Sequence, residues 1–249
     1  MSPRDLLAHR TVFEEYVCRR RHDLSCYHFS SVFLWKDFFE FDFRLIDGYL
    51  CVFAKHAFGS FLYLPPLGGT LNAAIVQKCF AELNALNTKR SFSRIENVSR
   101  DDLQYFDPQR YRWVEKSKEY CYRKEDLVQL KGNKFKSKRS SYNQFAKNNP
   151  WELRPFDRSL SADCIGLYEI WARNRKQWTQ DEIYQAMLDE NRMVHALIFQ
   201  HYDEIGLQGM VVSVDQKPQA YTFGYPLNDD TFCVLVEITN LDIKGLSVF

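Results

Sequence analysis

A cluster of basic residues in the middle of the chain is the strongest chemical signal in the sequence. Five cations lie within residues 131–139. At 100° per residue, Phe135, Tyr142 and Phe145 share one face of a helix here, and Lys138 falls in the middle of that face. An unpaired ammonium is too costly to bury, so Lys138 either extends past its neighbours into water or meets an anion. Both interpretations stay open; the anion would be a phosphate of RNA, of a lipid or of a cofactor.

Other catalytic chemistries have less support. The six histidines show no metal-ligand spacing, and the sequence predicts no metal site. We expect His201, on an apolar helix face, to be a satisfied core or boundary residue. No Ser-His-Asp signature or nucleophile elbow is present. Gly68 and Gly69 could hold an anion at a helix start, but without dinucleotide spacing a plain turn is the simpler interpretation.

Composition sets the class of protein. Of 249 residues, 45% are hydrophobic and 16% aromatic, which predicts a folded chain with a substantial core. The net charge of +1 predicts no global attraction to nucleic acid or membrane, so any such contact needs a local patch. The seven scattered cysteines are typical of a reducing compartment. No segment is apolar enough to be a signal peptide or to span a bilayer, and we expect a cytoplasmic protein.

The first half alternates strands and helices. Residues 39–45 and 50–54 alternate apolar and polar side chains around Asp47-Gly48, which predicts a hairpin with a tight primed turn. Apolar spacing predicts a helix over 72–87. Short strands are expected at 93–98 and 112–115. A long basic helix is predicted over 125–148, loosened at Gly132 and ended by Pro150, which we take as the domain boundary.

The second half begins with two predicted helices, 161–178 and 180–201. The second starts at a capping-box pattern, Thr179-x-x-Glu182, and places Ile183, Met187 and Val194 on one apolar face. Strands are predicted at 207–214, 220–225 and 232–238. The last is apolar at consecutive positions, so we expect both of its faces to be covered. The order predicts an α/β fold with a layered core.

A family resemblance appears in and around the basic segment. The residues that carry it are Tyr120-Cys-Tyr122-Arg-Lys-Glu-Asp126-Leu127, Leu130-Lys-Gly132, Lys134, Lys138-Arg139 and Asn143-Gln-Phe145, with later blocks at Leu153–Phe156, Ala220–Tyr225, Glu237 and Asp242-Ile-Lys-Gly245. This pattern resembles the C-terminal catalytic family of the lysylphosphatidylglycerol synthases (phosphatidylglycerol lysyltransferases), over about residues 25 to 245.

The resemblance implies a tandem GNAT-like fold, related to the Fem-type aminoacyltransferases, with mixed α+β sheets. The halves would be residues 1–150 and 151–249, with the site in the cleft between them. It implies transfer of an aminoacyl or acyl group, with aminoacyl-tRNA or acyl-CoA as co-substrate. Partners would be tRNA or a phosphate-bearing small molecule, and peripheral membrane contact is a weaker expectation. The alternative is a non-catalytic anion- or ligand-binding protein that keeps the fold.

The same resemblance indicates site residues. Lys134, Lys138 and Arg139 match the basic run and would bind the anion, and Gly224 would border the cleft. Aminoacyl transfer needs a proton acceptor and donors for the developing oxyanion. Glu237, at the end of an apolar strand, is the candidate acceptor, and Tyr225 the candidate donor. A solvated glutamate and a packed tyrosine are the structural alternatives.

The sequence departs from the pattern after Ile238. A GNAT half continues past its central strand into a glycine-bearing loop that holds the pyrophosphate of acyl-CoA, and residues 239–249 contain no such loop. We therefore expect a second half that is truncated, without the elements that would cover its sheet and without a built acyl-CoA site.

Overall fold

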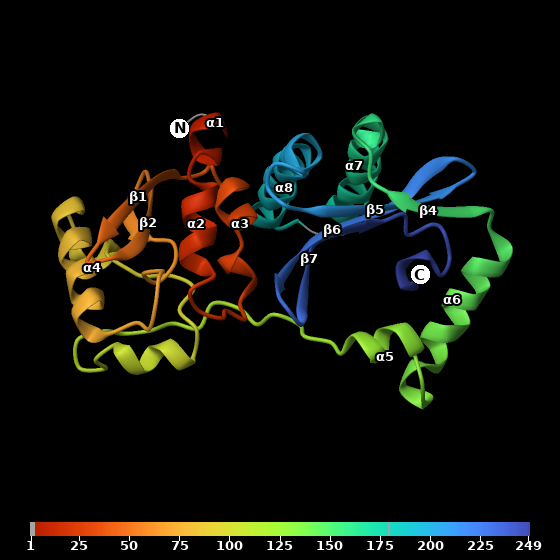
Figure 1. The fold of residues 1–249 in the computed structure, drawn as a ribbon. Helices are drawn as coiled ribbons and strands as arrows, with labels where there is room; N and C mark the ends of the chain where they lie inside the picture. The colour runs from red at the N-terminus through yellow and green to blue at the C-terminus, as the bar shows by residue number, and fades with distance from the viewer. Residues whose placement is uncertain (1–2, 179) are drawn as a thin grey trace. The chain divides into compact units, whose positions relative to one another are not determined.

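The computed structural model describes residues 3–178 and 180–249. It has a mixed α+β fold with two antiparallel sheets, one of three strands in the order β1-β2-β3 and one of four in the order β4-β5-β6-β7 (Figure 1). The chain forms two compact units. The first contains the chain up to Lys118 together with Pro226–Thr231, and the second contains Glu119–Tyr225 and Phe232–Phe249.

The first unit carries the three-stranded sheet. Its helices and strands are α1 (Pro3–Leu7), α2 (Arg10–Val17), α3 (Phe29–Phe33), β1 (Glu40–Ile46), β2 (Tyr49–His56), β3 (Gly59–Leu62) and α4 (Ala73–Leu86).

The predicted hairpin is confirmed by β1 and β2. Ile46 pairs with Tyr49 across a two-residue loop. In that loop Asp47 has φ 50° and Gly48 has φ 79°, the positive values that a primed turn requires. The Asp-Gly pair therefore sets the register of the sheet.

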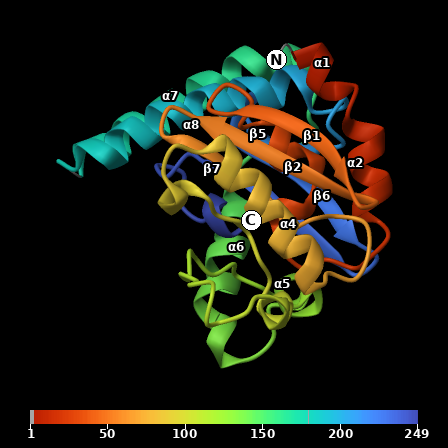
Figure 2. The same ribbon diagram turned by 90° about the vertical axis from the view of Figure 1, so that its left-hand side faces the viewer.

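Helix α4 confirms the helix predicted over 72–87 and closes the core of this unit. Asn72 caps it, because its Oδ1 accepts a hydrogen bond from the backbone N–H of Ile75 at 3.0 Å. The buried face, which includes Cys79 and Leu83, packs on Phe53 and other buried residues of the strands. Figure 2 shows the helix lying across the hairpin.

The strands predicted at 93–98 and 112–115 do not form. Ile95 makes one isolated bridge to Leu62, and residues 112–115 have no regular structure. Asn97 adopts φ 56°, which is incompatible with continuing a strand. Apolar alternation over so few residues indicates extended backbone, but a strand also needs a partner edge.

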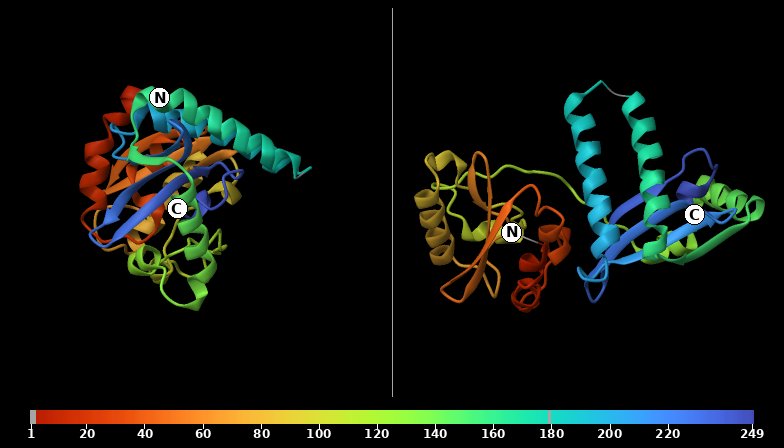
Figure 3. Two further views of the ribbon diagram at one scale, coloured as in Figure 1. Left: turned by 90° about the vertical axis from the view of Figure 1, so that its right-hand side faces the viewer. Right: turned by 90° about the horizontal axis from the view of Figure 1, so that it is seen from above.

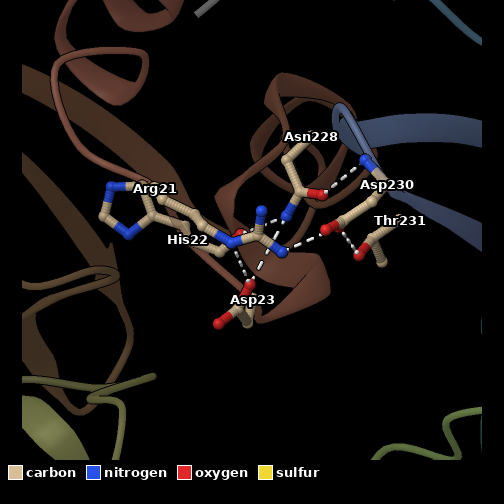
Figure 4. Close-up of polar contacts among 6 residues, drawn as sticks. All are labelled: Arg21, His22, Asp23, Asn228, Asp230 and Thr231. Carbon is tan, nitrogen blue, oxygen red and sulfur yellow. Dashed lines mark hydrogen bonds and ion pairs between the residues drawn. The ribbon is translucent and has the colours of Figure 1, made fainter.

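The tip of the β6–β7 hairpin belongs to the first unit. Arg21 forms an ion pair with Asp230 at 2.7 Å, and the amide of Asn228 donates to the carbonyl oxygen of His22 at 3.0 Å (Figure 4). Arg21 also contacts Asp23 at 3.1 Å. Residues more than two hundred positions apart are therefore joined in one polar cluster.

The second unit carries the four-stranded sheet. Its helices and strands are α5 (Lys124–Gln129), α6 (Lys136–Asn148), β4 (Trp151–Pro155), α7 (Ser161–Gln177), α8 (Glu182–His201), β5 (Gln208–Val214), β6 (Lys217–Asn228) and β7 (Thr231–Thr239), of which α7 and α8 run side by side (Figure 3). The helix and strands predicted at 161–178, 207–214, 220–225 and 232–238 are confirmed.

The two faces of this sheet are covered differently (Figure 1). Successive residues of a strand alternate between faces. On one face Tyr221 packs against Phe199 of α8, with ring centroids 5.2 Å apart. On the other, Ala220 packs with Phe145 of α6 and Leu246. The core therefore lies under α7 and α8, and a smaller apolar cluster lies under α6.

The compact units do not divide at residue 150. Proline ends α6 there, as predicted, but Phe145 of α6 is fully buried against Val214, Ala220 and Leu246 of the second unit. The units change instead between Lys118 and Glu119, so the whole basic segment lies in the second unit. A helix stop marks the end of an element, and the contacts of that element decide which domain it joins.

The single basic helix predicted over 125–148 is interrupted. Helix α5 ends where Leu130 adopts the left-handed conformation with φ 45°, and Gly132 follows with φ 87°. A short 3-10 turn at Asn133–Phe135 leads into α6. Gly132 therefore lies in a break between two helices.

Helix α8 begins later than the capping-box pattern indicates. Its N-cap is Asp181, whose side chain accepts from the N–H groups of Ile183 and Tyr184, and Thr179 lies outside the described residues. The predicted apolar face is wrong at this end, because Ile183 is 74% exposed. Burial begins at Leu188, one turn further along the helix.

Strand β7 is not covered on both faces as expected. Phe232 is 54% and Val234 is 61% exposed.

Two kinds of feature are absent from residues 3–178 and 180–249. No helix there is both long and apolar enough to cross a membrane, and no group of His, Cys, Asp or Glu side chains could hold a metal ion.

Candidate functional site

The basic segment of the second unit is a surface with few anionic neighbours. No Asp or Glu occurs between Leu127 and Trp151. Four lysines of this stretch are exposed and form no ion pair with any described residue: Lys131, Lys136, Lys138 and Lys147. We call these four residues the lysine set. Their charge is available to an external anion, because no carboxylate of the described chain neutralises it.

Lys134 is placed differently from the lysine set. Its Nζ lies 3.1 Å from Oδ2 of Asp126 and 4.8 Å from the ring centroid of Phe135. Both partners of the ion pair are exposed, so the pairing is weak and water competes for it. Lys134 can therefore bind an external anion if it gives up its ion pair with Asp126.

Arg139 orders the break between α5 and α6. Its Nη1 donates to the carbonyl oxygen of Gly132 at 2.8 Å and to that of Leu130. These carbonyls follow the end of α5, where backbone acceptors lack helical partners. Arg139, which was predicted to bind an anion, therefore stabilises the loop between α5 and α6, next to the exposed lysines.

Gly224 lies in the interior of the sheet. A Cβ at this position would collide with the carbonyl oxygen of Cys233 and with the ring of Phe232. The absence of a side chain lets β7 approach β6 closely. The structure thus gives Gly224 a packing role, at a distance from the lysines in sequence and on a different element.

Tyr225 is 1% exposed, and its hydroxyl forms a hydrogen bond with the thiol of Cys233. Burial raises the pKa of the Cys233 thiol, and the hydrogen bond from Tyr225 only partly opposes this. Cys233 is therefore a thiol at neutral pH and a poor nucleophile. Of the two interpretations of Tyr225, its burial fits the packed tyrosine.

Glu237 lies on β7 and is exposed, without an ion pair to any described residue. It does not meet Tyr225 in a shared polar cluster, since Tyr225 is buried and engaged with Cys233. The structure brings Gly224 and Tyr225 together with Cys233 and leaves Glu237 in solvent.

A polar hollow adjoins the basic helix. It has a volume of about 250 Å³ and is lined by Gln144, Asn148, Asn149, Asp242, Ile243 and Lys244. Amide groups from the end of α6 here face a carboxylate and an ammonium from the chain after β7. Neither segment alone identifies the hollow, because a contact between residues a hundred positions apart has no local sequence signal.

The α7–α8 side contains a second hollow of about 230 Å³, and of the three cations that line it, Lys176 and Arg192 are paired while Arg173 forms no ion pair with a described residue. Lys176 contacts Asp189 at 2.6 Å, and Arg192 contacts Glu169 at 2.7 Å. Both pairs join α7 to α8. This hollow therefore offers an incoming anion less uncompensated charge than the lysine set does.

Helix α8 carries a buried histidine that was not among the predicted site residues. His195 is 4% exposed, and its Nδ1 lies 2.9 Å from the hydroxyl of Tyr221. Burial lowers the pKa of His195 to about 4, so its imidazole is neutral at pH 7. By contrast, His201 contacts Glu204 at the boundary of the helix, as expected.

Comparisons with known proteins agree with this fold. A crystal structure of a conserved Bacteroides thetaiotaomicron protein of unknown function superposes with a TM-score of 0.81 at 24% identity, covering 97% of this chain and 81% of that one. The C-terminal domain of an Agrobacterium fabrum protein assigned as a lysylphosphatidylglycerol synthetase gives a TM-score of 0.57 at 12% identity, covering 100% and 73%. These similarities concern the fold.

No curated protein matches the chain. The family described as phosphatidylglycerol lysyltransferase, C-terminal, matches residues 19–248, which is nearly the whole chain and includes both units and the basic segment. The chain therefore belongs to the phosphatidylglycerol lysyltransferase C-terminal family.

Proposed function

We propose that this protein is a transferase that moves an aminoacyl or acyl group, with aminoacyl-tRNA as the donor. The observation that carries the proposal is the lysine set: four exposed, unpaired cations on an acid-free segment of a chain that belongs to a lysyltransferase family. Nucleic acid binds such surfaces by releasing condensed counterions.

Two exposed tyrosines next to this segment support RNA as the donor. Tyr120 is 90% exposed and Tyr122 is 65% exposed, and their rings lie nearly parallel at 15° with centroids 6.5 Å apart. Exposed aromatic faces beside cations are suited to stack unpaired bases. Both precede α5 in the second unit.

We propose a tandem GNAT-type fold for the chain. Each unit contains two helices followed by an antiparallel meander of three strands: α2 and α3 with β1–β3, and α7 and α8 with β5–β7. Repetition of one order of elements supports two related halves.

A binding protein without turnover is the second candidate, because the proposed catalytic pair is not assembled. Tyr225 is buried on Cys233 while Glu237 is exposed in water. A general base and a hydrogen-bond donor must both reach the reacting group. Under this alternative the lysines would bind RNA and no group would be transferred.

The experiment that tests the proposal follows radiolabelled aminoacyl-tRNA with the purified chain and a panel of amine and hydroxyl acceptors, including phosphatidylglycerol vesicles. We expect loss of label from tRNA into an acceptor, and at least tenfold slower loss with the K138A variant. Tight tRNA binding without transfer would establish the binding protein instead. Loss of label at the same rate with and without the protein, and no tRNA binding, would exclude both candidates.

A further inference from the structure

Two cysteine thiols are in contact in the core of the first unit. Cys51 lies on β2 and Cys79 on α4, and their sulfur atoms are 3.6 Å apart. Both side chains are fully buried, in the same apolar cluster as Phe53 and Leu83. Two cysteines that serve only as small apolar residues would also give this contact. Whether the pair can react depends on how firmly the two sulfurs are held together.

Two polar links join α4 to the β1–β2 hairpin and hold the sulfurs in place. Lys78, next to Cys79 on the helix, forms an ion pair with Asp47 in the turn of the hairpin. At the start of the helix, the side-chain amide of Asn72 donates to the hydroxyl of Tyr49 on β2 at 3.1 Å. These links fix the position of the helix along the hairpin, so the contact between the sulfurs is a stable feature of the unit.

The two sulfurs need only a small movement to form a bond. A disulfide has an S–S length of about 2.05 Å, so atoms that are 3.6 Å apart must approach by about 1.5 Å. Rotation about the two Cα–Cβ bonds moves the sulfurs by distances of this size. The cysteines are 28 positions apart in the chain, so the bond would close a loop and restrict the unfolded chain.

We propose that Cys51 and Cys79 are a redox-sensitive pair, which a disulfide oxidant such as oxidised glutathione converts to a disulfide that fastens α4 to the β1–β2 hairpin. In the first step one cysteine thiolate attacks a sulfur of oxidised glutathione, which releases one glutathione and leaves a mixed disulfide. The other cysteine thiolate then attacks the protein sulfur of that bond and releases the second glutathione. The protein loses two protons and two electrons, and the oxidant becomes two glutathione thiols.

Burial controls the rate of this reaction. The thiolate is the attacking form, and the hydrogen bond with Cys79, followed by burial, raises the pKa of the Cys51 thiol. Glutathione also cannot reach side chains that are fully buried. Oxidation therefore requires α4 to open from the hairpin. It should be slow in the native protein and faster in mild urea, which favours local opening.

The first experiment identifies the bond directly. The full chain is incubated with mixtures of reduced and oxidised glutathione, with and without mild urea, and after the remaining thiols are blocked its peptides are mapped by mass spectrometry. We expect a cross-linked pair of peptides containing Cys51 and Cys79, lighter by two hydrogen atoms than the two reduced peptides together. Its yield should rise with the share of oxidised glutathione and fall again on addition of dithiothreitol. Exposed cysteines such as Cys18 should carry single glutathione adducts, which the map distinguishes.

The second experiment compares the thermal unfolding of the oxidised and reduced protein. The cross-link should raise the melting temperature of the first unit by about 5 °C or more. The C51A and C79A variants cannot form it and should melt at the same temperature in both buffers. C164A, which removes a fully buried thiol from α7 in the second unit, is the matched control and should show the same rise as the parent.

Absence of the Cys51–Cys79 cross-link from the parent, in mild urea as in buffer alone, would overturn the proposal. So would a cross-link that appears only in fully unfolded chains, or one that leaves the melting temperature unchanged or lowers it, because α4 would then not be fastened in its native position. Peptide mapping of the parent requires no variant to fold. None of these results depends on whether the protein transfers an aminoacyl group.

Discussion

The two sides of the four-stranded sheet differ in how their charged side chains are paired. On the α7–α8 side, His195 is buried with Tyr221, and Lys176 and Arg192 have carboxylate partners. On the α6 side, the lysine set has no carboxylate partner among the described residues. Both sides therefore carry cations, but the α6 side has four unpaired lysines, whereas Arg173 is the one unpaired cation among the described residues that line the α7–α8 hollow.

The largest expected effect is the loss of tRNA binding when the lysine set is removed. Replacing all four lysines with alanine should weaken tRNA binding about a thousandfold or more at 0.1 M salt, because each phosphate contact contributes close to tenfold there. The slope of log K against log salt should become less negative by about 3 to 4. Fluorescence anisotropy across a salt series measures both quantities.

The α7–α8 side supplies the control for this change. The double variant K176A and R192A removes two cations whose charge is already compensated. It should leave the salt slope of tRNA binding unchanged. Equal changes of slope in the two sets of variants would show that net charge, and not unpaired charge, drives binding. Binding to anionic vesicles but not to tRNA would identify a membrane surface as the ligand.

An effect of medium size is expected on the α7–α8 side, in the pH dependence of stability. His195 has a pKa of about 4 when folded and about 6.5 when unfolded, because burial disfavours its charged form. Below pH 6.5 the unfolded chain therefore binds a proton that the native chain does not. His195 stabilises the fold above that pH, and this contribution is lost as the pH falls from about 6.5 toward 4.

The expected size is up to about 1.4 kcal/mol of unfolding free energy per pH unit in that window. Urea unfolding at pH 7 and pH 5 measures it, and H195N, which cannot titrate there, should lose less stability between the two values than the parent. Because His22 and His28 are half-buried and desolvation lowers their pKa values as well, the parent should retain a residual slope. An identical slope in H195N and the parent would show that His195 is already accessible to protons in the native state.

The sequence predicted elements well where the signal was local. Asp47-Gly48 determined a hairpin register, and alternation and apolar spacing located α4, α7 and the strands β5 to β7. It was wrong where the outcome depended on distant contacts. Pro150 ends a helix, yet Phe145 ties that helix to strands seventy residues further on. A strand was predicted over residues 93–98, but Ile95 makes only a single bridge, to Leu62.

The candidate site divides in the same way. The cations of residues 131–139 follow from composition, and the structure exposes most of them. The role of Arg139 was not predictable, because its hydrogen bonds to Leu130 and Gly132 depend on a helix break. The pairing of Tyr225 with Cys233 depends on how β6 meets β7, which alternation does not specify.

The smallest expected effect concerns the ion pairs that join α7 to α8. Arg192 and Glu169 are 2.7 Å apart, with side chains 51% and 43% exposed. Water screens such a pair, so a double-mutant cycle with R192A and E169A should give a coupling of about 0.2 to 1 kcal/mol in urea unfolding. The pair would then contribute little to stability while still removing a cation from the surface. A coupling several times larger would mean that the α7–α8 charges hold the helices together, and their neutrality would be a consequence of folding stability.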